Sequence, residues 1–168
     1  MSQAEVADGK QSEWYTQAAS VALEEVMRFA GESGGHRLKL DVPAEYGGGE
    51  APQPMQLLLL SLAGCTGMDV LSILRKKRQR ITGLEVEARG RRVEEHPRIF
   101  DRVEISYRVR GEGVAEAAVE RAIELSRDRY CPVIATVRST VEVLTSYTVE
   151  NDLERDAAAG TDAPEDGG

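Results

Sequence analysis

The chain has few residues of the types that usually mark a secreted or metal-binding protein. Its 168 residues include two cysteines, two histidines and one tryptophan. Two cysteines are too few for a disulfide framework, and a hydrophobic fraction of 41% is enough to form a core without one. Residues 1–13 are polar and lack the apolar segment of a signal peptide. We therefore expect a cytoplasmic protein, in which a cysteine pair is more often catalytic or metal-binding than structural.

The folded part of the chain also lacks an excess of charge of either sign. The formal net charge is −8, but residues 151–168 contain six acids and one arginine and so carry −5 of it. The other 150 residues carry −3. Nucleic-acid binding requires a basic stripe, so we expect no nucleic-acid partner.

Two common ligand motifs are absent. The run Gly47–Gly49 leads into prolines and not into a lysine-bearing helix, which excludes a phosphate-binding loop. The chain has neither the short C-x-x-C nor the H-x₃₋₅-H spacing typical of zinc sites. A metal site assembled from distant residues remains an alternative, and its candidate ligands are Cys65, Cys131, His36 and His96.

The pattern of apolar residues predicts one α+β domain. We expect a flexible leader over 1–13, the folded domain over 14–150 and a disordered acidic tail over 151–168. Period-two alternation and turn residues predict strands, and longer amphipathic stretches predict helices. The expected elements are strands 15–24, 26–31 and 36–42, a helix 54–78, a hairpin of strands 82–93 and 100–109, helices 114–129 and 132–138, and a strand 140–149. This order is not a strict βαβ alternation, which favours the α+β class.

The helix that begins at Pro54 is the most apolar element. Residues 57–74 are apolar nearly all round, which predicts a buried core helix. A membrane span is disfavoured because Asp69 would lie near its centre, at a cost of about 2.5–3.5 kcal/mol. One small sheet cannot easily cover such a helix on all sides, so the pattern favours an intertwined dimer.

The two cysteines have contrasting local settings. Cys131 precedes Pro132, which predicts that it caps a helix whose positive end favours the thiolate. Cys65 lies within the apolar helix, one turn before Asp69, and a carboxylate there disfavours a second negative charge. Without a nearby cation Cys65 would be an inert core thiol, and burial in the core is the alternative for either cysteine.

Two cysteine-centred motifs carry a specific resemblance. The first runs from Pro54-Met-Gln-Leu-Leu-Leu to Leu62-Ala-Gly-Cys65-Thr-Gly-Met-Asp-Val70, and the second from Glu124-Leu-Ser to Tyr130-Cys131-Pro-Val. In this order they resemble the OsmC/Ohr family, the osmotically inducible protein C and organic hydroperoxide resistance proteins. Further stretches resemble its YhfA-like branch, namely Met27-Arg-Phe29, Gly35-His36, His96-Pro-Arg-Ile-Phe100 and Ser146-Tyr147. The resemblance covers about residues 21–150 and implies antiparallel sheets around a long buried helix, in an intertwined homodimer.

The resemblance implies a thiol-dependent peroxidase for organic hydroperoxides. Cys65 takes the peroxidatic role and becomes a sulfenic acid, and Cys131 resolves it to a disulfide. An external dithiol such as dihydrolipoamide then reduces the disulfide, so no bound cofactor and no metal is expected. No membrane partner is expected either.

The family's thiolate-stabilising arginine falls on Arg28, with Arg37 as a weaker substitute. An arginine there would supply the cation that Cys65 lacks. The family also has a glutamate at the start of the long helix that holds the arginine, but this chain has Met55 and Gln56 there. Gln56 can orient an arginine without neutralising it, and Glu50 could reach in from the loop. The missing glutamate favours an alternative function, a non-enzymatic redox sensor or a small-ligand-binding module on the same fold.

Overall fold

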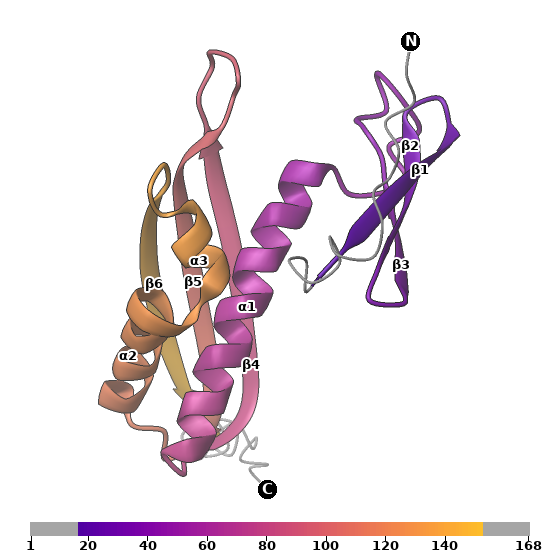
Figure 1. Ribbon diagram of the computed structural model, residues 1–168. Helices are drawn as coiled ribbons and strands as arrows, with labels where there is room; N and C mark the ends of the chain where they lie inside the picture. The colour runs from indigo at the N-terminus through magenta and orange to yellow at the C-terminus, as the bar shows by residue number, and fades with distance from the viewer. Residues whose placement is uncertain (1–16, 153–168) are drawn as a thin grey trace, which may run out of the picture. The chain divides into compact units, whose positions relative to one another are not determined.

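The computed structural model describes residues 17–152 (Figure 1). The expected leader over 1–13 and residues 153–168 of the expected tail lie outside the described residues. The chain divides into two compact units between Leu57 and Leu58. Each unit has one three-stranded sheet, which agrees with the predicted α+β class.

The first unit contains an antiparallel sheet of three consecutive strands. They are β1 (Ala19–Glu25), β2 (Arg28–Ser33) and β3 (His36–Leu40). The turn between β2 and β3 is formed by Gly34 and Gly35, whose φ angles of 57° and 78° suit glycine. Every residue of β1 is exposed, including Val21 at 60% and Leu23 at 62%. This sheet therefore presents apolar side chains that its own unit does not cover.

The long helix α1 (Pro54–Lys76) is framed by clear start and stop signals. Pro54 occupies its first position, where its missing N–H is not needed. The side chain of Gln56 accepts a hydrogen bond from the backbone N–H of Gln53 at 2.8 Å, which satisfies a donor just ahead of the helix. The helix ends two residues earlier than predicted, because Arg78 adopts a φ of 58° that a helix cannot continue.

Only one face of α1 is buried. Its fully buried side chains recur every four residues, at Leu62, Thr66, Val70 and Leu74. The helix approaches strand β4 (Arg80–Arg92) closely, since a Cβ at Gly67 would lie 3.2 Å from a methyl group of Val86. Other apolar side chains of α1 are exposed, with Leu60 at 67% and Met68 at 76%. The expected burial on all sides is thus not reached within the second unit, because its sheet covers a single face of the helix.

Among residues 17–152, α1 is the one helix long and apolar enough to cross a membrane by length and composition. A core helix passes the same test. The buried stripe of α1 packs inside the second unit, as the sequence pattern predicts for a core helix.

The second unit contains a mixed sheet with its helices on one face (Figure 1). Strands β4 (Arg80–Arg92) and β5 (Phe100–Glu112) form the predicted antiparallel hairpin, but β6 (Glu142–Asn151) runs parallel to β5. The expectation of purely antiparallel sheets is therefore wrong for this pair. The chain crosses from β5 to β6 through α2 (Glu116–Leu125), a π-helical turn η2 (Ser126–Tyr130) and α3 (Pro132–Val137), and such a crossover returns the chain in the same direction.

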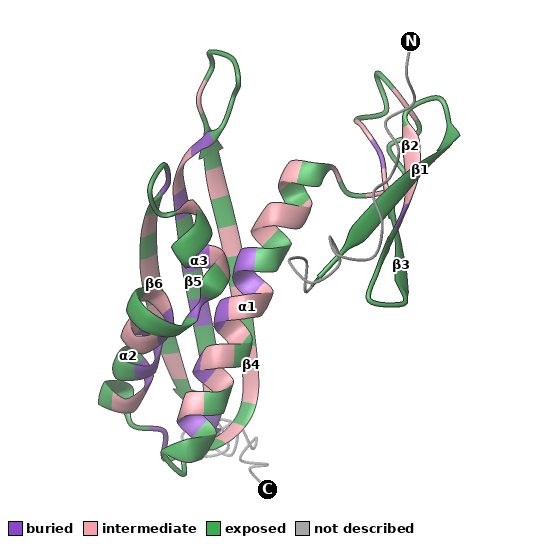
Figure 2. Cartoon of the chain, in the orientation of Figure 1, coloured by how far each residue is buried: buried purple, intermediate pink, exposed green. Residues whose placement is uncertain are grey.

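Strand β5 separates the core from the outer face of this sheet. Its alternate residues Val103, Ile105, Tyr107 and Val109 are at most 2% exposed, as the alternation predicts. Buried positions lie where the helices meet the sheet (Figure 2).

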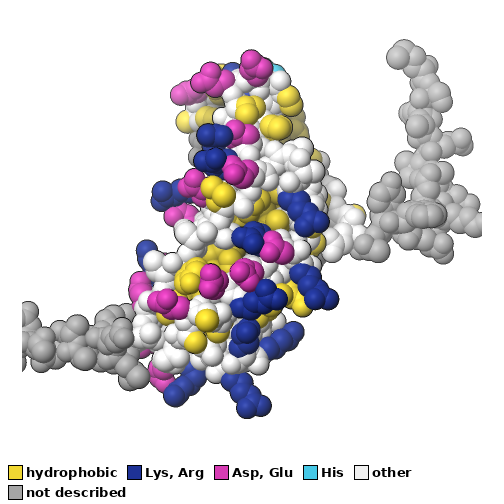
Figure 3. Space-filling view, turned by 90° about the vertical axis from the view of Figure 1, so that its left-hand side faces the viewer, with side chains coloured by type: hydrophobic (Ala, Val, Ile, Leu, Met, Phe, Trp, Pro, Cys, Tyr) yellow, Lys and Arg dark blue, Asp and Glu magenta, His cyan; other side chains and the backbone are white. Residues whose placement is uncertain are grey.

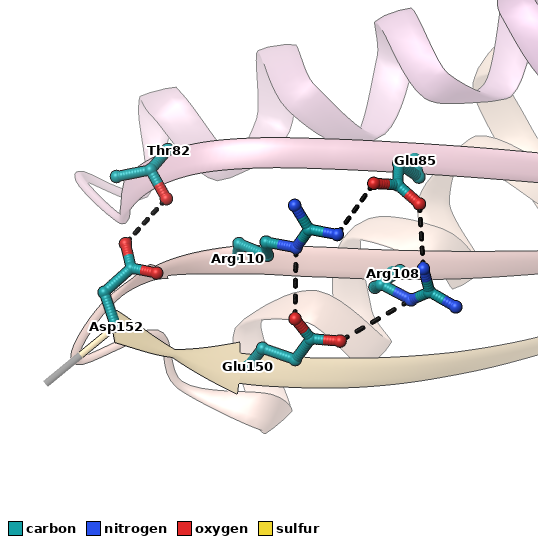
Figure 4. A network of polar contacts seen from close by, with 6 residues as sticks. All are labelled: Thr82, Glu85, Arg108, Arg110, Glu150 and Asp152. Atoms are coloured by element: carbon teal, nitrogen blue, oxygen red, sulfur yellow. Dashed lines mark hydrogen bonds and ion pairs between the residues drawn. The ribbon is translucent and has the colours of Figure 1, made fainter. Parts of the chain in front are cut away.

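The outer face is held by ion pairs across all three strands (Figure 4). Arg108 and Arg110 of β5 each contact Glu85 of β4 and Glu150 of β6, at 2.8–3.5 Å. These pairs are solvent-exposed, so each contributes little to stability. Together they join residues that lie close to one another on neighbouring strands and so favour the observed register. On another side of the molecule, the left-hand side of Figure 1, acidic and basic side chains are also both present (Figure 3).

The disordered tail was expected to begin at residue 151, but residues 151 and 152 are part of the fold. Asn151 ends β6 and accepts a hydrogen bond from the N–H of Val114 at 2.9 Å, and Asp152 accepts one from the Thr82 hydroxyl at 2.7 Å (Figure 4). Both residues belong to the folded unit because the start of the tail is bound to β4 and to the segment after β5.

Candidate functional site

Cys131 lies at the start of α3 in the predicted capping position. Its Sγ atom accepts a hydrogen bond from the N–H of Ile134 at 3.4 Å, and Pro132 occupies the first turn of the helix. The side chain is 3% exposed. A short polar side chain followed by proline is a typical helix start, and here the sulfur takes the capping role.

A widened helical turn delivers Cys131 to this position. The sequence predicts a helix over 114–129, but α2 ends at Leu125 and the π-helical turn η2 follows. The N–H of Cys131 donates to the carbonyl of Ser126, five residues back, at 2.9 Å. Such turns insert one extra residue and often occur at functional sites. Here the turn points the Ser126 hydroxyl toward α1.

The two sulfur atoms are in contact. Cys131 Sγ lies 3.1 Å from Cys65 Sγ, with Cys131 as the donor, and both cysteines are free. Cys65 is partly exposed and Cys131 is buried. A disulfide requires an S–S distance of about 2.05 Å, so the sulfurs need to approach by only about 1 Å to bond. The structure thus brings together two residues that are 66 positions apart in the chain.

Burial, together with the neighbouring Cys65, raises the pKa of the Cys131 thiol to about 11. The N–H groups of Ile134 and Val133 act in the opposite direction but do not outweigh burial. The expectation that the helix start favours the thiolate of Cys131 thus holds for the local N–H groups but not for the net pKa. The reason is that these two N–H groups do not replace the water that a thiolate loses on burial.

Four further residues lie near the sulfurs, and the sequence analysis assigned none of them a function: Ser126, Asp69, Tyr107 and Thr66. The Ser126 hydroxyl, fully buried, donates to Asp69 Oδ2 at 3.0 Å. The Tyr107 hydroxyl is buried without a hydrogen-bond partner of normal geometry, and the nearby Thr66 hydroxyl instead donates to the carbonyls of Leu62 and Ala63. Burial raises the pKa of Tyr107 to about 12, with Thr66 partly offsetting the effect. The only signal in the sequence was the four-residue spacing of Cys65 and Asp69.

The cluster does not have the geometry of a metal site. Donor atoms of Cys65, Asp69 and Cys131 lie within 4.8 Å of one another. Two thiolates on one tetrahedral zinc, with Zn–S bonds of about 2.3 Å, lie about 3.8 Å apart. The observed 3.1 Å is shorter and suits direct sulfur–sulfur chemistry. His96, which lies in the same unit, does not belong to this cluster.

The first unit holds Arg28 among carboxylates. Its guanidinium contacts Glu50 at 2.7 Å and Glu24 at 3.6 Å, and it also pairs with Glu25. Glu50 does reach in from the loop, whereas Gln56 caps α1 and makes no contact with Arg28. The orienting role expected of Gln56 is therefore corrected, because its side chain is used at the helix start. Arg37 is 86% exposed and pairs with Glu32 at 3.7 Å, which does not fit a site residue.

Residues 47–159 match the family model described as OsmC-like protein. A relative in Escherichia coli (strain K12), Protein YhfA, is 38% identical over 132 residues, which cover 78% of this chain and 96% of the relative. The chain belongs to the OsmC-like family.

Solved structures of other proteins share the fold. A hypothetical protein from Aquifex aeolicus VF5 has a TM-score of 0.74 at 30% identity, over 82% of this chain and 98% of that one. An organic hydroperoxide resistance protein OsmC from Legionella pneumophila has a TM-score of 0.61 at 20% identity, over 80% and 98% of the two chains. The OsmC-like fold predicted from the two cysteine motifs is confirmed.

Proposed function

We propose that this protein is a thiol-dependent peroxidase that reduces organic hydroperoxides through Cys65 and Cys131. The observation that supports it most strongly is the 3.1 Å contact between two free sulfurs from separate helices. Family membership adds support, since a protein of the same fold is named an organic hydroperoxide resistance protein. The roles of the individual residues are part of this proposal.

The asymmetry of the two sulfurs supports Cys65 as the peroxidatic residue. Cys65 is the more exposed of the two and accepts the hydrogen bond that Cys131 donates. In the proposed step the Cys65 thiolate attacks the terminal oxygen of the hydroperoxide and the O–O bond breaks. The alkoxide takes up the proton that the Cys65 thiol released on ionising, and it leaves as the alcohol. Cys131 then attacks the sulfenic sulfur, a disulfide forms and water leaves. An external dithiol such as dihydrolipoamide reduces the disulfide and completes the cycle.

Arg28 is proposed to stabilise the Cys65 thiolate, and a homodimer is part of the proposal. Apolar side chains exposed on β1 and on α1, among them Leu23 at 62% and Met68 at 76%, require cover that one chain does not supply. Sedimentation equilibrium of the purified protein should give a mass twice the 18.4 kDa of the chain. A monomer at micromolar concentration would contradict the dimer.

A redox sensor is the second candidate, and the surroundings of Arg28 favour it. Three glutamates, Glu24, Glu25 and Glu50, contact its guanidinium, and its charge is also opposed by Asp41 nearby. A cation surrounded by carboxylates stabilises a thiolate less than a free one does. On this reading the Cys65–Cys131 disulfide forms slowly and is not recycled.

The test is consumption of cumene hydroperoxide and hydrogen peroxide by reduced protein with dihydrolipoamide, dithiothreitol or thioredoxin. Wild type should turn over, faster with the organic peroxide. Cys65→Ser should abolish turnover, and Cys131→Ser should stop after one equivalent and leave a sulfenic acid that dimedone traps. Full activity in Cys65→Ser would overturn the peroxidase proposal. A disulfide that forms with no turnover under any of these reductants would establish the sensor instead.

A further inference from the structure

Three groups that can exchange a proton meet in the second unit. The sulfurs of Cys65 and Cys131 and a carboxylate oxygen of Asp69 lie within 4.8 Å of one another. Cys65 and Asp69 occupy successive turns of α1, and Cys131 comes from the start of α3. One water molecule bridges a gap of this size with two ordinary hydrogen bonds, so a proton can pass between the thiol and the carboxylate.

The carboxylate is held in place for this contact. Ser126, which is 0% exposed, donates to Asp69 Oδ2 at 3.0 Å. This is the hydrogen bond that Asp69 makes within the described part of the chain, and it leaves Oδ1 to accept another. The Tyr107 hydroxyl, 2% exposed and without a hydrogen-bond partner, lies close enough to interact with both Cys131 and Asp69. The neighbourhood thus holds a buried polar group that is not satisfied by the protein around it.

We propose that Asp69 accepts the proton of Cys131 when the disulfide closes and passes it to the leaving group. This inference rests on the proposed peroxidase function, because the oxidant is the hydroperoxide that converts Cys65 to a sulfenic acid. The S–H bond of Cys131 breaks and its proton goes to Asp69. The Cys131 sulfur bonds to the Cys65 sulfur, the S–OH bond breaks, and the proton on Asp69 joins the departing hydroxide as water. The sulfenic sulfur is reduced and the thiol sulfur is oxidised, so the step needs no other electron donor.

The surroundings explain why Cys131 needs a proton acceptor. Its pKa is raised to about 11 by burial, so little of it is thiolate at neutral pH. The groups near it are Cys65 and Asp69 from α1, Tyr107 from β5 and the N–H of Ile134 at the start of α3. Arg127 from η2 acts on Tyr107. Tyrosine with a pKa of about 12 and arginine do not accept a proton at neutral pH. Asp69 is the carboxylate in this set.

Disulfide closure can be measured without peroxide. Reduced protein is treated with one equivalent of an aromatic disulfide, which reacts at the partly exposed Cys65. Attack by Cys131 then forms the Cys65–Cys131 disulfide and releases a coloured aryl thiolate, and stopped-flow absorbance gives the rate. The proton of Cys131 must leave in this reaction as it does after peroxide, so the same acceptor is tested.

The variant is Asp69→Asn, whose amide oxygen can still accept the Ser126 hydrogen bond. At neutral pH it should close about 100-fold more slowly than wild type, within the usual range for a lost general base. Its rate should rise in proportion to hydroxide and approach that of wild type near pH 11, where Cys131 ionises unaided. The matched control is Asp128→Asn in η2, an exposed acid paired with Arg127, which should close at the wild-type rate.

A rate and pH profile in Asp69→Asn equal to those of wild type would overturn the proposal. Ser126→Ala, which keeps the carboxylate but removes its donor, should close more slowly while keeping the wild-type pH profile. If neither variant folds, the pH dependence of the closure rate in the wild-type protein decides. A rate proportional to hydroxide through neutral pH would exclude a protein base. Failure of the peroxidase proposal is distinguishable, since it would appear as normal closure with the aromatic disulfide and no consumption of hydroperoxide.

Discussion

Removing the Ser126 hydroxyl should destabilise the protein much more than a typical serine substitution. The side chain is 0% exposed and donates to the Asp69 carboxylate at 3.0 Å. A hydrogen bond to a charged group contributes about 1.5–3 kcal/mol, and Ser126→Ala also leaves a carboxylate oxygen without its donor. We expect a loss of about 2 kcal/mol in the free energy of unfolding, measured by urea denaturation with an unchanged slope. Ser106→Ala on the exposed face of β5 is the control and should change it by less than about 0.5 kcal/mol.

The charge contribution can be separated by a double-mutant cycle. Asp69→Asn converts a charge-assisted hydrogen bond into a neutral one, which is about half as strong. Ser126→Ala should therefore cost about 1 kcal/mol less in the Asp69→Asn background than in wild type. Equal costs in the two backgrounds, or a cost below about 0.5 kcal/mol in wild type, would show that the contact between η2 and α1 does not hold the carboxylate.

Three further outcomes follow from single contacts. Tyr107→Phe removes a buried hydroxyl that lacks a hydrogen-bond partner, so the protein should be as stable as wild type or more stable by up to about 1–2 kcal/mol. The melting temperature in calorimetry should therefore stay the same or rise, and a clear fall in it would reveal a hydrogen bond to Thr66. Gly111→Ala places a Cβ 2.0 Å from the Arg80 carbonyl and should cost about 2–3 kcal/mol, while Gly83→Ala, with contacts of 3.5 Å or more, should cost under about 1 kcal/mol in the same denaturation assay. The pKa of Asp41 is held below 3.8, because the N–H groups of Val42, Glu50 and Gly48 and the charge of Arg28 outweigh the opposing effect of desolvation. Its stabilisation is complete above pH 3.8 and is lost as the pH falls through its lower folded value, so acid titration should show a shallower loss of stability below pH 3.8 in Asp41→Asn.

The sequence predicted elements that have a strong period or a clear boundary residue. The alternation from Arg102 to Val109 gave the buried face of β5 correctly, and Pro132 placed Cys131 at the start of a helix. The direction of β6 was not predictable from alternation, since a strand has the same period in either direction. The family resemblance, carried by two motifs, supplied the pairing of Cys65 with Cys131, which no local pattern contains.

Predictions from the sequence were wrong where burial opposes a local effect. A helix start favours a thiolate, and reasoning from Pro132 alone gave the wrong direction for the pKa of Cys131, because only the packed structure shows that the thiol is buried. The role predicted for Gln56 was wrong for a similar reason. An amide side chain can either cap a helix or bind an arginine, and in the structure Gln56 caps the helix. The contact of Asp69 with Ser126 spans 57 residues and depends on a π-helical turn, which no residue pattern indicates.

The two cysteine side chains differ in how firmly they are held. This difference indicates which sulfur moves when the disulfide forms. Cys131 is fixed by its Sγ bond from Ile134, by its N–H bond to Ser126 and by its carbonyl, which accepts from Ala135 at 3.1 Å. Cys65 is partly exposed, and within residues 17–152 its side chain makes no hydrogen bond besides the one with Cys131. The approach of about 1 Å is therefore easier for the Cys65 side chain than for the capped one.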